Sequence, residues 1–306
     1  MSAGNCMTIK AIAPWFGGKR TIAETVIAEL GPHRSFWDVT GGGFSIVLAK
    51  QPSSHEIVND LHGDITNLAC VIASSRAPEL YGRLQRVLMC EEIVACARAV
   101  VSVPFNLSMP VELAVSDEHL ERAYWYFIVS WSCRNGVSGT ERTNYQIAVR
   151  WTSGGGSGAV RFRSAVESLP AWHWRLRSVE ILRRDLFAVL PRIEDQEGTA
   201  IYIDPPYLQG GARSGASTYL YEFEPMDHAR LSEAAGRFLK ARVVVSYYDS
   251  PLLAELYPGW TKVAVAANKN LHVQNRRGSE KCEAPEVLLL NGRSFTMVQP
   301  TNESTG

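Results

Sequence analysis

The sequence predicts an α/β protein with a doubly wound parallel sheet, and three observations favour this fold. In the first quarter of the chain, short apolar runs of strand length alternate with segments whose apolar residues recur at helical spacing. One of these runs ends in the glycine turn Gly41-Gly42-Gly43, and a helical pattern follows. Strand patterns resume after residue 177 and again alternate with helical ones, as expected of strands joined by crossover helices.

The N-terminal elements are expected in the order helix, strand, helix, strand, helix. Apolar spacing predicts a first helix from Arg20 to Leu30, which Gly31-Pro32 ends, because glycine suits a helix C-terminus and proline cannot continue a helix. Strands are predicted over residues 35–40 and 55–59, and helices over 44–50 and 64–73. We expect the two strands to pair in parallel, since a helix connects them.

A different pattern occupies the middle of the chain. Helical segments are predicted around residues 78–87 and 117–131, followed by a polar, glycine-rich stretch over 134–164. Further strands are predicted at 179–182, 199–203, 242–246 and 286–290, with helices at 227–239 and 252–256. The sequence therefore predicts a discontinuous α/β domain, residues 1–75 and 178–306, interrupted by a second domain over 76–177.

Composition excludes several classes of protein. The chain has 306 residues, 46% of them hydrophobic, which is enough for a large buried core. No stretch approaches the roughly 20 apolar residues of a membrane helix, and residues 1–13 lack a signal-peptide layout, so a cytoplasmic location and no membrane partner are expected. The six cysteines lack the spacing of a disulfide framework or a zinc site, and no metal is expected.

The segment TAIYIDPPY, residues 199–207, carries the strongest chemical signal. Its apolar strand delivers Asp204 to the carboxyl end, where ligands bind in open α/β sheets. Pro205 and Pro206 fix the turn, so a proline carbonyl and the Asp204 carboxylate offer two acceptors to an exocyclic NH2 group. Tyr207 offers a face on which a nucleobase can stack. The alternative, a strand-ending turn with incidental prolines, stays open.

Two further features fit a nucleoside ligand. The glycines 41–43 permit close approach of the backbone to a ligand at the start of a helix. Asp60 ends the second strand, where nucleoside-binding folds place an acceptor for ribose hydroxyls. The alternative for Asp60 is a helix N-cap or turn residue.

Local charge favours a nucleic-acid partner, although the 31 Lys and Arg of the whole chain balance 31 Asp and Glu. Residues 134–184 contain nine arginines and no lysine against three glutamates. Arginine suits phosphates and guanine edges, and Trp151, Trp172 and Trp174 lie among these arginines. Gly154-Gly155-Gly156 predicts the tip of a β-hairpin loop between Trp151 and Arg161. The alternative is a solvated basic face with core tryptophans.

In order and content these motifs resemble the Dam-like, alpha-class family of DNA adenine-N(6) methyltransferases. The resemblance covers residues 11 to about 291 and is carried by Trp15-Phe16-Gly17-Gly18-Lys19, Asp38 with the glycines, Asn59-Asp60 and Asp204-Pro205-Pro206-Tyr207. Asn135-Gly136 with Asn144, Asp185 ahead of Phe187, residues 246–251 and residues 286–289 are similar to further pieces of that family. The chain departs from the family at Asp38-Val39-Thr40, where Glu-Pro-Phe is usual, and at Phe44, where a glycine is usual.

The resemblance implies a Rossmann-like S-adenosylmethionine-dependent methyltransferase sheet with an inserted, mainly helical target-recognition module. It assigns cofactor binding to Trp15, Gly17, Gly18, Lys19, Asp38, Gly41, Gly42, Gly43, Asp60 and Asp185. It assigns the extruded target adenine to Asp204, Pro205, Pro206 and Tyr207. Together with the basic stretch, it assigns DNA binding to Arg134, Asn135, Arg142, Asn144, Arg150, Arg161 and Arg163.

The expected function is methyl transfer from S-adenosylmethionine to the N(6) amino group of an adenine flipped out of duplex DNA. Two alternatives stay open: a cytosine-N(4) or RNA-base methyltransferase, and a non-catalytic DNA-binding relative. The expected partner is double-stranded DNA, with a companion restriction nuclease as an open question. A monomer is favoured.

Overall fold

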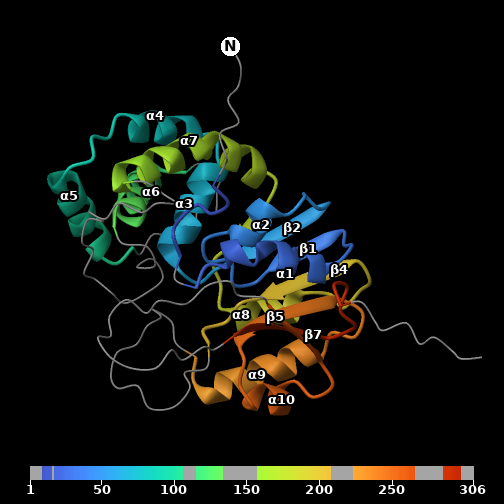
Figure 1. Ribbon diagram of the computed structural model, residues 1–306. Helices are drawn as coiled ribbons and strands as arrows, with labels where there is room; N and C mark the ends of the chain where they lie inside the picture. The colour runs from blue at the N-terminus through green and yellow to red at the C-terminus, as the bar shows by residue number, and fades with distance from the viewer. Residues whose placement is uncertain are drawn as a thin grey trace, which may run out of the picture.

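The computed structural model describes residues 9–15, 17–105, 115–133, 157–207, 223–265 and 285–297. A seven-stranded sheet in the order β3-β2-β1-β4-β5-β7-β6 lies at its centre (Figure 1). The strands are β1 Ser35–Asp38, β2 His55–Asn59, β3 Glu180–Leu182, β4 Thr199–Ile203, β5 Arg242–Tyr248, β6 Thr261–Ala264 and β7 Glu286–Leu290. The first five strands of this order pair in parallel, as predicted for β1 and β2, whereas β7 is antiparallel to both β5 and β6.

The predicted α/β class is therefore confirmed, and the sheet is mixed and mostly parallel. The order β3-β2-β1-β4-β5 is compatible with a Rossmann-like fold, in which the order reverses between the first and fourth strands. The short edge strand β6 was not predicted. Its burial alternates around a single buried apolar residue, Val263, which is too little to distinguish a strand from a loop.

Helices cover both faces of the sheet. The helices that precede β3 in the chain are α1 Ala23–Leu30, α2 Ser45–Ala49, α3 Gly63–Ala73, α4 Ala77–Gln85, α5 Glu91–Ser102, α6 Asp117–Ser132 and α7 Gly158–Leu176. The helices that follow β3 are α8 Leu186–Val189, α9 Pro225–Gly236 and α10 Leu252–Leu256. The 3-10 turns Lys19–Thr21 and Leu190–Arg192 complete the regular structure described. Among these helices, none is long and apolar enough to cross a membrane.

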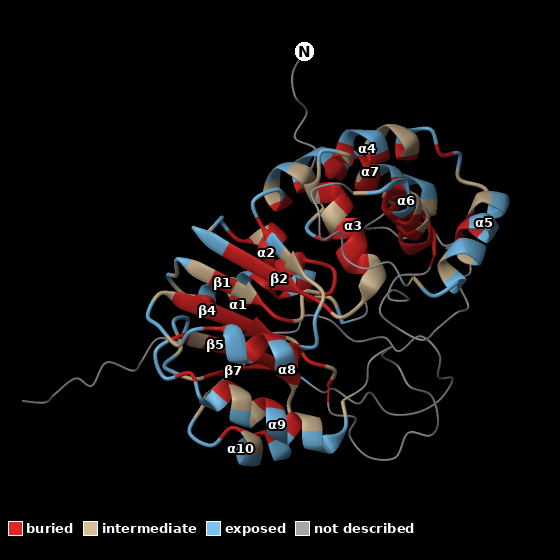
Figure 2. Cartoon of the chain, turned by 180° about the vertical axis from the view of Figure 1, so that it is seen from behind, coloured by how far each residue is buried: buried red, intermediate tan, exposed pale blue. Residues whose placement is uncertain are grey.

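The alternation of strand side chains divides the hydrophobic core in two. In β4, Ala200 and Tyr202 belong to the core that α1 to α7 share, whereas Ile201 and Ile203 belong to the core beneath α8, α9 and α10. This is the period of two that a strand buried on both faces must show. Figure 2 shows β4 buried along its length between these layers.

The helices α4 to α7 gather beyond the β2 side of the sheet, where α3, α6 and α7 pack on one another (Figure 1). Their apolar residues continue the core of the first sheet face without a break. Helix α5 was not predicted. The expected glycine-rich stretch over 134–164 is wrong from residue 158 onward, because Ser157 caps α7 by accepting from the Val160 amide and apolar residues beginning with Phe162 recur at helical spacing.

Arg161 and Arg163 consequently lie on helix α7, and the predicted hairpin does not extend to them. The predicted hairpin tip, residues 154–156, lies outside the described residues, as do Arg134, Asn135, Arg142, Asn144 and Arg150.

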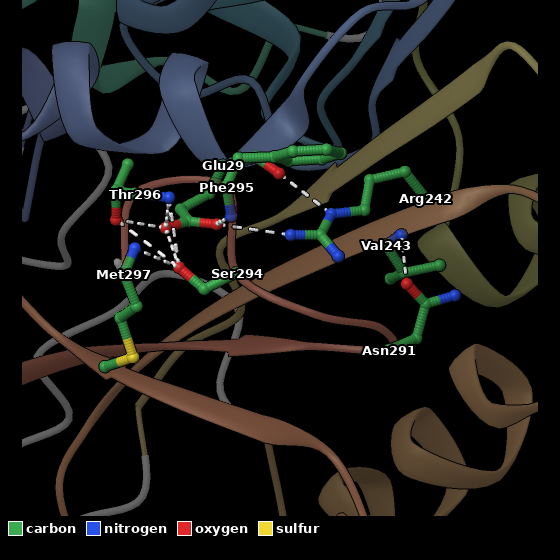
Figure 3. A network of polar contacts seen from close by, with 8 residues as sticks. All are labelled: Glu29, Arg242, Val243, Asn291, Ser294, Phe295, Thr296 and Met297. Atoms are coloured by element: carbon green, nitrogen blue, oxygen red, sulfur yellow. Dashed lines mark hydrogen bonds and ion pairs between the residues drawn. The ribbon is translucent and has the colours of Figure 1, made fainter. Parts of the chain in front are cut away.

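The segment after β7 returns to the first helix. Glu29 of α1 is fully buried and accepts hydrogen bonds from the amides of Phe295 and Thr296 and from the Ser294 hydroxyl (Figure 3). Arg242 at the start of β5 forms an ion pair with the same carboxylate at 3.2 Å. These contacts fasten the end of the described chain beside α1 and β5.

The strand directions decide which residues meet. Asp38 of β1 pairs with Val58 of β2 and with Tyr202 of β4, so the residues that follow these strands share one edge of the sheet. Because β7 runs antiparallel, its first residue, Glu286, pairs with Tyr248 at the end of β5 and lies at that same edge.

Candidate functional site

A cavity opens at the carboxyl edge of the parallel strands. Its wall includes eight residues that the sequence had assigned to a ligand site: Trp15, Gly17, Lys19, Asp60, Asp185, Asp204, Pro205 and Pro206. It also includes residues that the sequence had not assigned, among them Thr40, His62, Arg184 and Phe223. Gly18, Asp38, the glycines 41–43 and Tyr207 do not belong to the wall.

Asp204 is held by three contacts at the end of β4. Its Oδ2 lies 2.8 Å from the Lys19 Nζ, and its Oδ1 accepts a hydrogen bond from the Ser246 hydroxyl at 2.8 Å. Its backbone N–H donates to the Thr40 Oγ1 at 2.6 Å. The carboxylate is therefore oriented from β5, from the turn after β1 and from the segment before α1, and free lone pairs remain on its oxygens.

Lys19 is buried among acceptors. Its ammonium donates to the Gly17 carbonyl at 2.5 Å, lies 3.3 Å from the Glu286 carboxylate and sits 4.8 Å from the centre of the Tyr207 ring. Burial lowers the pKa of Lys19, but the charges of Asp204 and Glu286 outweigh burial and raise this pKa above its ordinary value. Lys19 therefore carries a positive charge at neutral pH.

Burial raises the pKa of Asp204, and the Lys19 ammonium opposes this shift without cancelling it. A carboxylate with a raised pKa is a better proton acceptor than an ordinary aspartate, and a site of this kind in a cavity is a candidate for chemistry.

Asp60 combines a structural role with a place in the wall. Its Oδ2 accepts from the Gly42 amide at 2.7 Å and its Oδ1 from the His62 amide at 2.8 Å. Asp60 is therefore a turn residue, as the alternative interpretation of the sequence allowed. Each carboxylate oxygen keeps a second lone pair, so these bonds leave acceptor sites for a ligand in the cavity.

The glycine turn approaches its own chain closely. A Cβ on Gly42, whose φ is +49°, would lie 2.7 Å from the Trp15 indole nitrogen, and a Cβ on Gly41 would lie 2.3 Å from a methyl group of Val58. The glycines therefore let Trp15 and β2 pack against the turn, and they shape the cavity through Trp15.

Phe44 and Val39, which depart from the family pattern, lie in different parts of the structure. Phe44 adopts a left-handed conformation with φ of +63° and is fully buried in the core, away from the cavity. Val39 is one of the residues of the cavity wall. The bulk of Phe44 consequently takes no space from a ligand there.

Asp38 is buried, and its Oδ1 has no hydrogen-bond partner among the described residues. Burial, together with the carboxylates of Asp204 and Asp60, raises the pKa of Asp38 well above its ordinary value. Asp185 differs from Asp38 because it caps α8, where its Oδ1 accepts from the Phe187 amide at 2.8 Å, and it faces the cavity.

Tyr207 is buried and braced from two sides. Its hydroxyl donates to the Glu286 carboxylate at 2.6 Å, and its ring meets Tyr248 edge-on with 4.4 Å between ring centres. Glu286 therefore contacts both Lys19 and Tyr207, although the sequence did not assign it to the site. Its position as the first residue of a strand was visible in the sequence, but the direction of that strand was not.

The described arginines of the basic stretch have mixed roles. Arg175 forms a partly buried bidentate pair with Glu56, and Arg163 donates to the Gln85 carbonyl at 2.9 Å. Arg177 stacks 3.7 Å from the centre of the exposed Trp174 ring. Part of the local positive charge therefore serves packing within the chain.

No protein-family model matches this chain, and neither does any curated protein.

Proposed function

We propose that the chain is an S-adenosylmethionine-dependent DNA methyltransferase that acts on the N(6) amino group of adenine, as the Dam-like motifs predict. One observation carries the proposal: a single cavity joins Asp204-Pro205-Pro206, the residues expected at the target base, to Asp60 and Asp185, the residues expected at the cofactor. Its position at the carboxyl edge of the parallel strands is where ligands of doubly wound sheets bind.

The residues of the cavity fit S-adenosylmethionine. Asp60 and Asp185 present carboxylate oxygens from the ends of neighbouring strands, as ribose hydroxyls and an adenine amino group require. Trp15 and Phe223 add aromatic surface to the wall. When bound, S-adenosylmethionine supplies a methyl group on a positively charged sulfur.

Asp204 and the turn that follows would hold the target amine. The Asp204 carboxylate and the Pro205 carbonyl accept its two N–H protons, which fixes the nitrogen and draws its lone pair out of conjugation with the ring. The contacts from Thr40, Ser246 and Lys19 keep this carboxylate in place before the base arrives. Such preorganisation lowers the barrier because no protein group must move at the moment of reaction.

The same proposal includes an inserted module that binds DNA. We infer that α4 to α7, with the segment that precedes α7, form the inserted target-recognition module, and that Arg161 and Arg163 contribute to DNA binding together with the assigned residues of 134–150. The ring centre of Tyr126 in α6 lies 5.9 Å from that of His62 in the cavity wall, which supports this inference because a duplex that delivers a base to Asp204 must pass nearby.

Sequencing of host DNA tests the proposal directly. Genomic DNA from cells that express the parental chain or its Asp204→Ala variant is sequenced with a method sensitive to base modification. The expected result is N(6)-methyladenine at one short sequence context with the parental chain only. N(4)-methylcytosine or modified RNA would assign a different base, and the absence of modification, together with no cofactor binding by calorimetry, would favour a non-catalytic relative.

A further inference from the structure

The Glu286 carboxylate is the second acidic group on the Lys19 ammonium. Lys19 Nζ lies 2.8 Å from Asp204 and 3.3 Å from Glu286, so one ammonium joins two carboxyl groups from different strands. The side chain of Glu286 is 18% exposed and that of Asp204 is 17% exposed, which leaves both poorly screened by water.

Glu286 also holds the aromatic residue of the Asp204-Pro205-Pro206-Tyr207 turn. The same oxygen, Oε1, that faces Lys19 accepts the Tyr207 hydroxyl at 2.6 Å. The backbone of Glu286 is itself fixed, because its carbonyl accepts from the Val265 amide at 2.9 Å and its strand pairs with Tyr248. One rigid carboxylate therefore sets the positions of two neighbours of Asp204.

We propose that Glu286 is a positioning residue for methyl transfer: it keeps the Lys19 ammonium on Asp204 and the Tyr207 ring in its orientation. The inference rests on the proposed function and deepens it. Glu286 acts through Lys19 and Tyr207 and does not touch the reacting atoms.

The charge of this cluster suits the reaction. In methyl transfer the amine would gain a C–N bond and a positive charge as the C–S bond of the cofactor breaks, and it would then lose one N–H proton to the Asp204 carboxylate. Asp204 alone would be neutralised by Lys19. With Glu286 the cluster has one carboxylate in excess, which stabilises a positive charge that develops on the amine.

Three variants separate the functions of Glu286. Glu286→Gln keeps an acceptor oxygen for Tyr207 but removes the charge, Glu286→Ala removes both, and Tyr207→Phe removes only the donated hydroxyl. Glu255→Gln, on the exposed side of α10, is the matched control. Each is assayed for kcat and KM of methyl transfer to duplex DNA, and for the fluorescence of 2-aminopurine at the target base without cofactor.

We expect Glu286→Ala to lower kcat by about 10- to 100-fold, with the KM for S-adenosylmethionine unchanged, because small misplacements of catalytic groups have effects of this size. The 2-aminopurine signal should fall in Glu286→Ala and recover in part in Glu286→Gln. Because the charge of Glu286 raises the pKa of Asp204, the acidic limb of the kcat profile should move to lower pH in Glu286→Gln. The titratable groups that interact with Asp204 include Lys19, Glu286, Asp38, Tyr202 and Tyr207, and the Ser246 hydroxyl donates a hydrogen bond to it.

Parental values of kcat, fluorescence and pH profile in Glu286→Gln and Glu286→Ala would overturn the positioning role while the proposed function stands. A parental chain that transfers no methyl group to DNA would instead overturn the proposed function itself. If Glu286→Ala does not fold, the pH profile and kcat of Glu286→Gln decide the question.

Discussion

The Thr40 hydroxyl accepts a hydrogen bond from the backbone N–H of Asp204 at 2.6 Å and thereby joins the ends of β1 and β4. The two strands are parallel neighbours, and this bond continues their contact two residues beyond the end of β1 and one residue beyond the end of β4. It also fixes the peptide group from which the Asp204 side chain extends. Thr40 stands where the family resemblance predicts a different residue, and this contact gives it a role.

Thr40→Val should therefore lower the rate of methyl transfer and leave the fold intact. The substitution keeps the shape of the side chain but leaves the Asp204 amide without its acceptor, at a cost of about 1–3 kcal/mol. Thr40→Ser keeps the hydroxyl and is the control. Single-turnover rates at saturating cofactor provide the measurement, and equal rates for Thr40→Val and the parental chain would show that this contact does not position Asp204.

Asp204→Ala should abolish methyl transfer and spare most cofactor binding. The reason is that this carboxylate is assigned to the target amine and not to the cofactor, and its contribution is made chiefly in the transition state. Tritium transfer from labelled cofactor measures the first effect and calorimetry the second. A variant that methylates adenine at near the parental rate would remove Asp204 from the mechanism.

Asp60→Ala should weaken binding of S-adenosylmethionine by about 1–3 kcal/mol, as expected when buried hydroxyl groups lose their acceptor. Because Asp60 also accepts from the Gly42 and His62 amides, the same variant should melt at a lower temperature. Asp60→Asn retains one acceptor oxygen and should recover part of the stability. Calorimetry and thermal unfolding separate the two effects, and full cofactor affinity in Asp60→Ala would place the nucleoside site elsewhere.

Asp38→Asn should stabilise the protein increasingly as the pH rises. The pKa of Asp38 is raised well above its ordinary value of 3.8 by burial, so between that value and the raised pKa the unfolded chain ionises Asp38 while the folded chain keeps the proton. Folding then takes up a proton, and the parental chain loses up to about 1.4 kcal/mol per pH unit relative to the variant. Urea unfolding at pH 5, 6 and 7 tests this, and a constant difference between the two chains would contradict it.

The assigned arginines should divide into phosphate and base contacts. An alanine substitution at a phosphate contact should weaken binding to all DNA sequences alike and reduce the slope of log K against log salt concentration by about 1. An alanine substitution at a base contact should instead relax specificity at one position of the recognition sequence. The residues to test are Arg134, Arg142, Arg150, Arg161 and Arg163, with the exposed Arg192 as the control. Unchanged salt slope and sequence preference in all five variants would move DNA recognition to the α/β domain.

Much of the sheet could be predicted because its central strands β4, β5 and β7 are buried on both faces. The apolar runs over 55–59, 199–203 and 286–290 match the observed strands residue for residue. Helix α7 was not predicted, because glycine, serine and arginine dominate the composition at its start, although Phe162, Ala165, Val166 and Leu169 have helical spacing and are buried. Composition and periodicity disagreed, and periodicity reports the packing.

The candidate site could be predicted only in part, for a related reason. Asp60 and Asp204 are visible in the sequence because each follows a strand, and parallel strands end at one edge, whereas Asp185 was assigned by the family resemblance alone. Glu286 begins its strand, and it reaches that edge only because β7 is antiparallel to β5. Nothing local to residues 286–290 indicates this direction, so the second partner of Lys19 had to come from the structure.

The antiparallel course of β7 also has a consequence for synthesis of the chain. Lys19, which contacts Asp204, lies near the beginning of the sequence, whereas its second carboxylate, Glu286, begins β7, the last strand along the described chain. A nascent chain that ends before β7 can form the parallel strands but leaves Lys19 with only one of its two carboxylates. The hydrogen bonds of Glu29 with Ser294, Phe295 and Thr296 then join the segment after β7 to helix α1. Both partners of Lys19 and the contacts of Glu29 can therefore form only after residues 286–296 have left the ribosome.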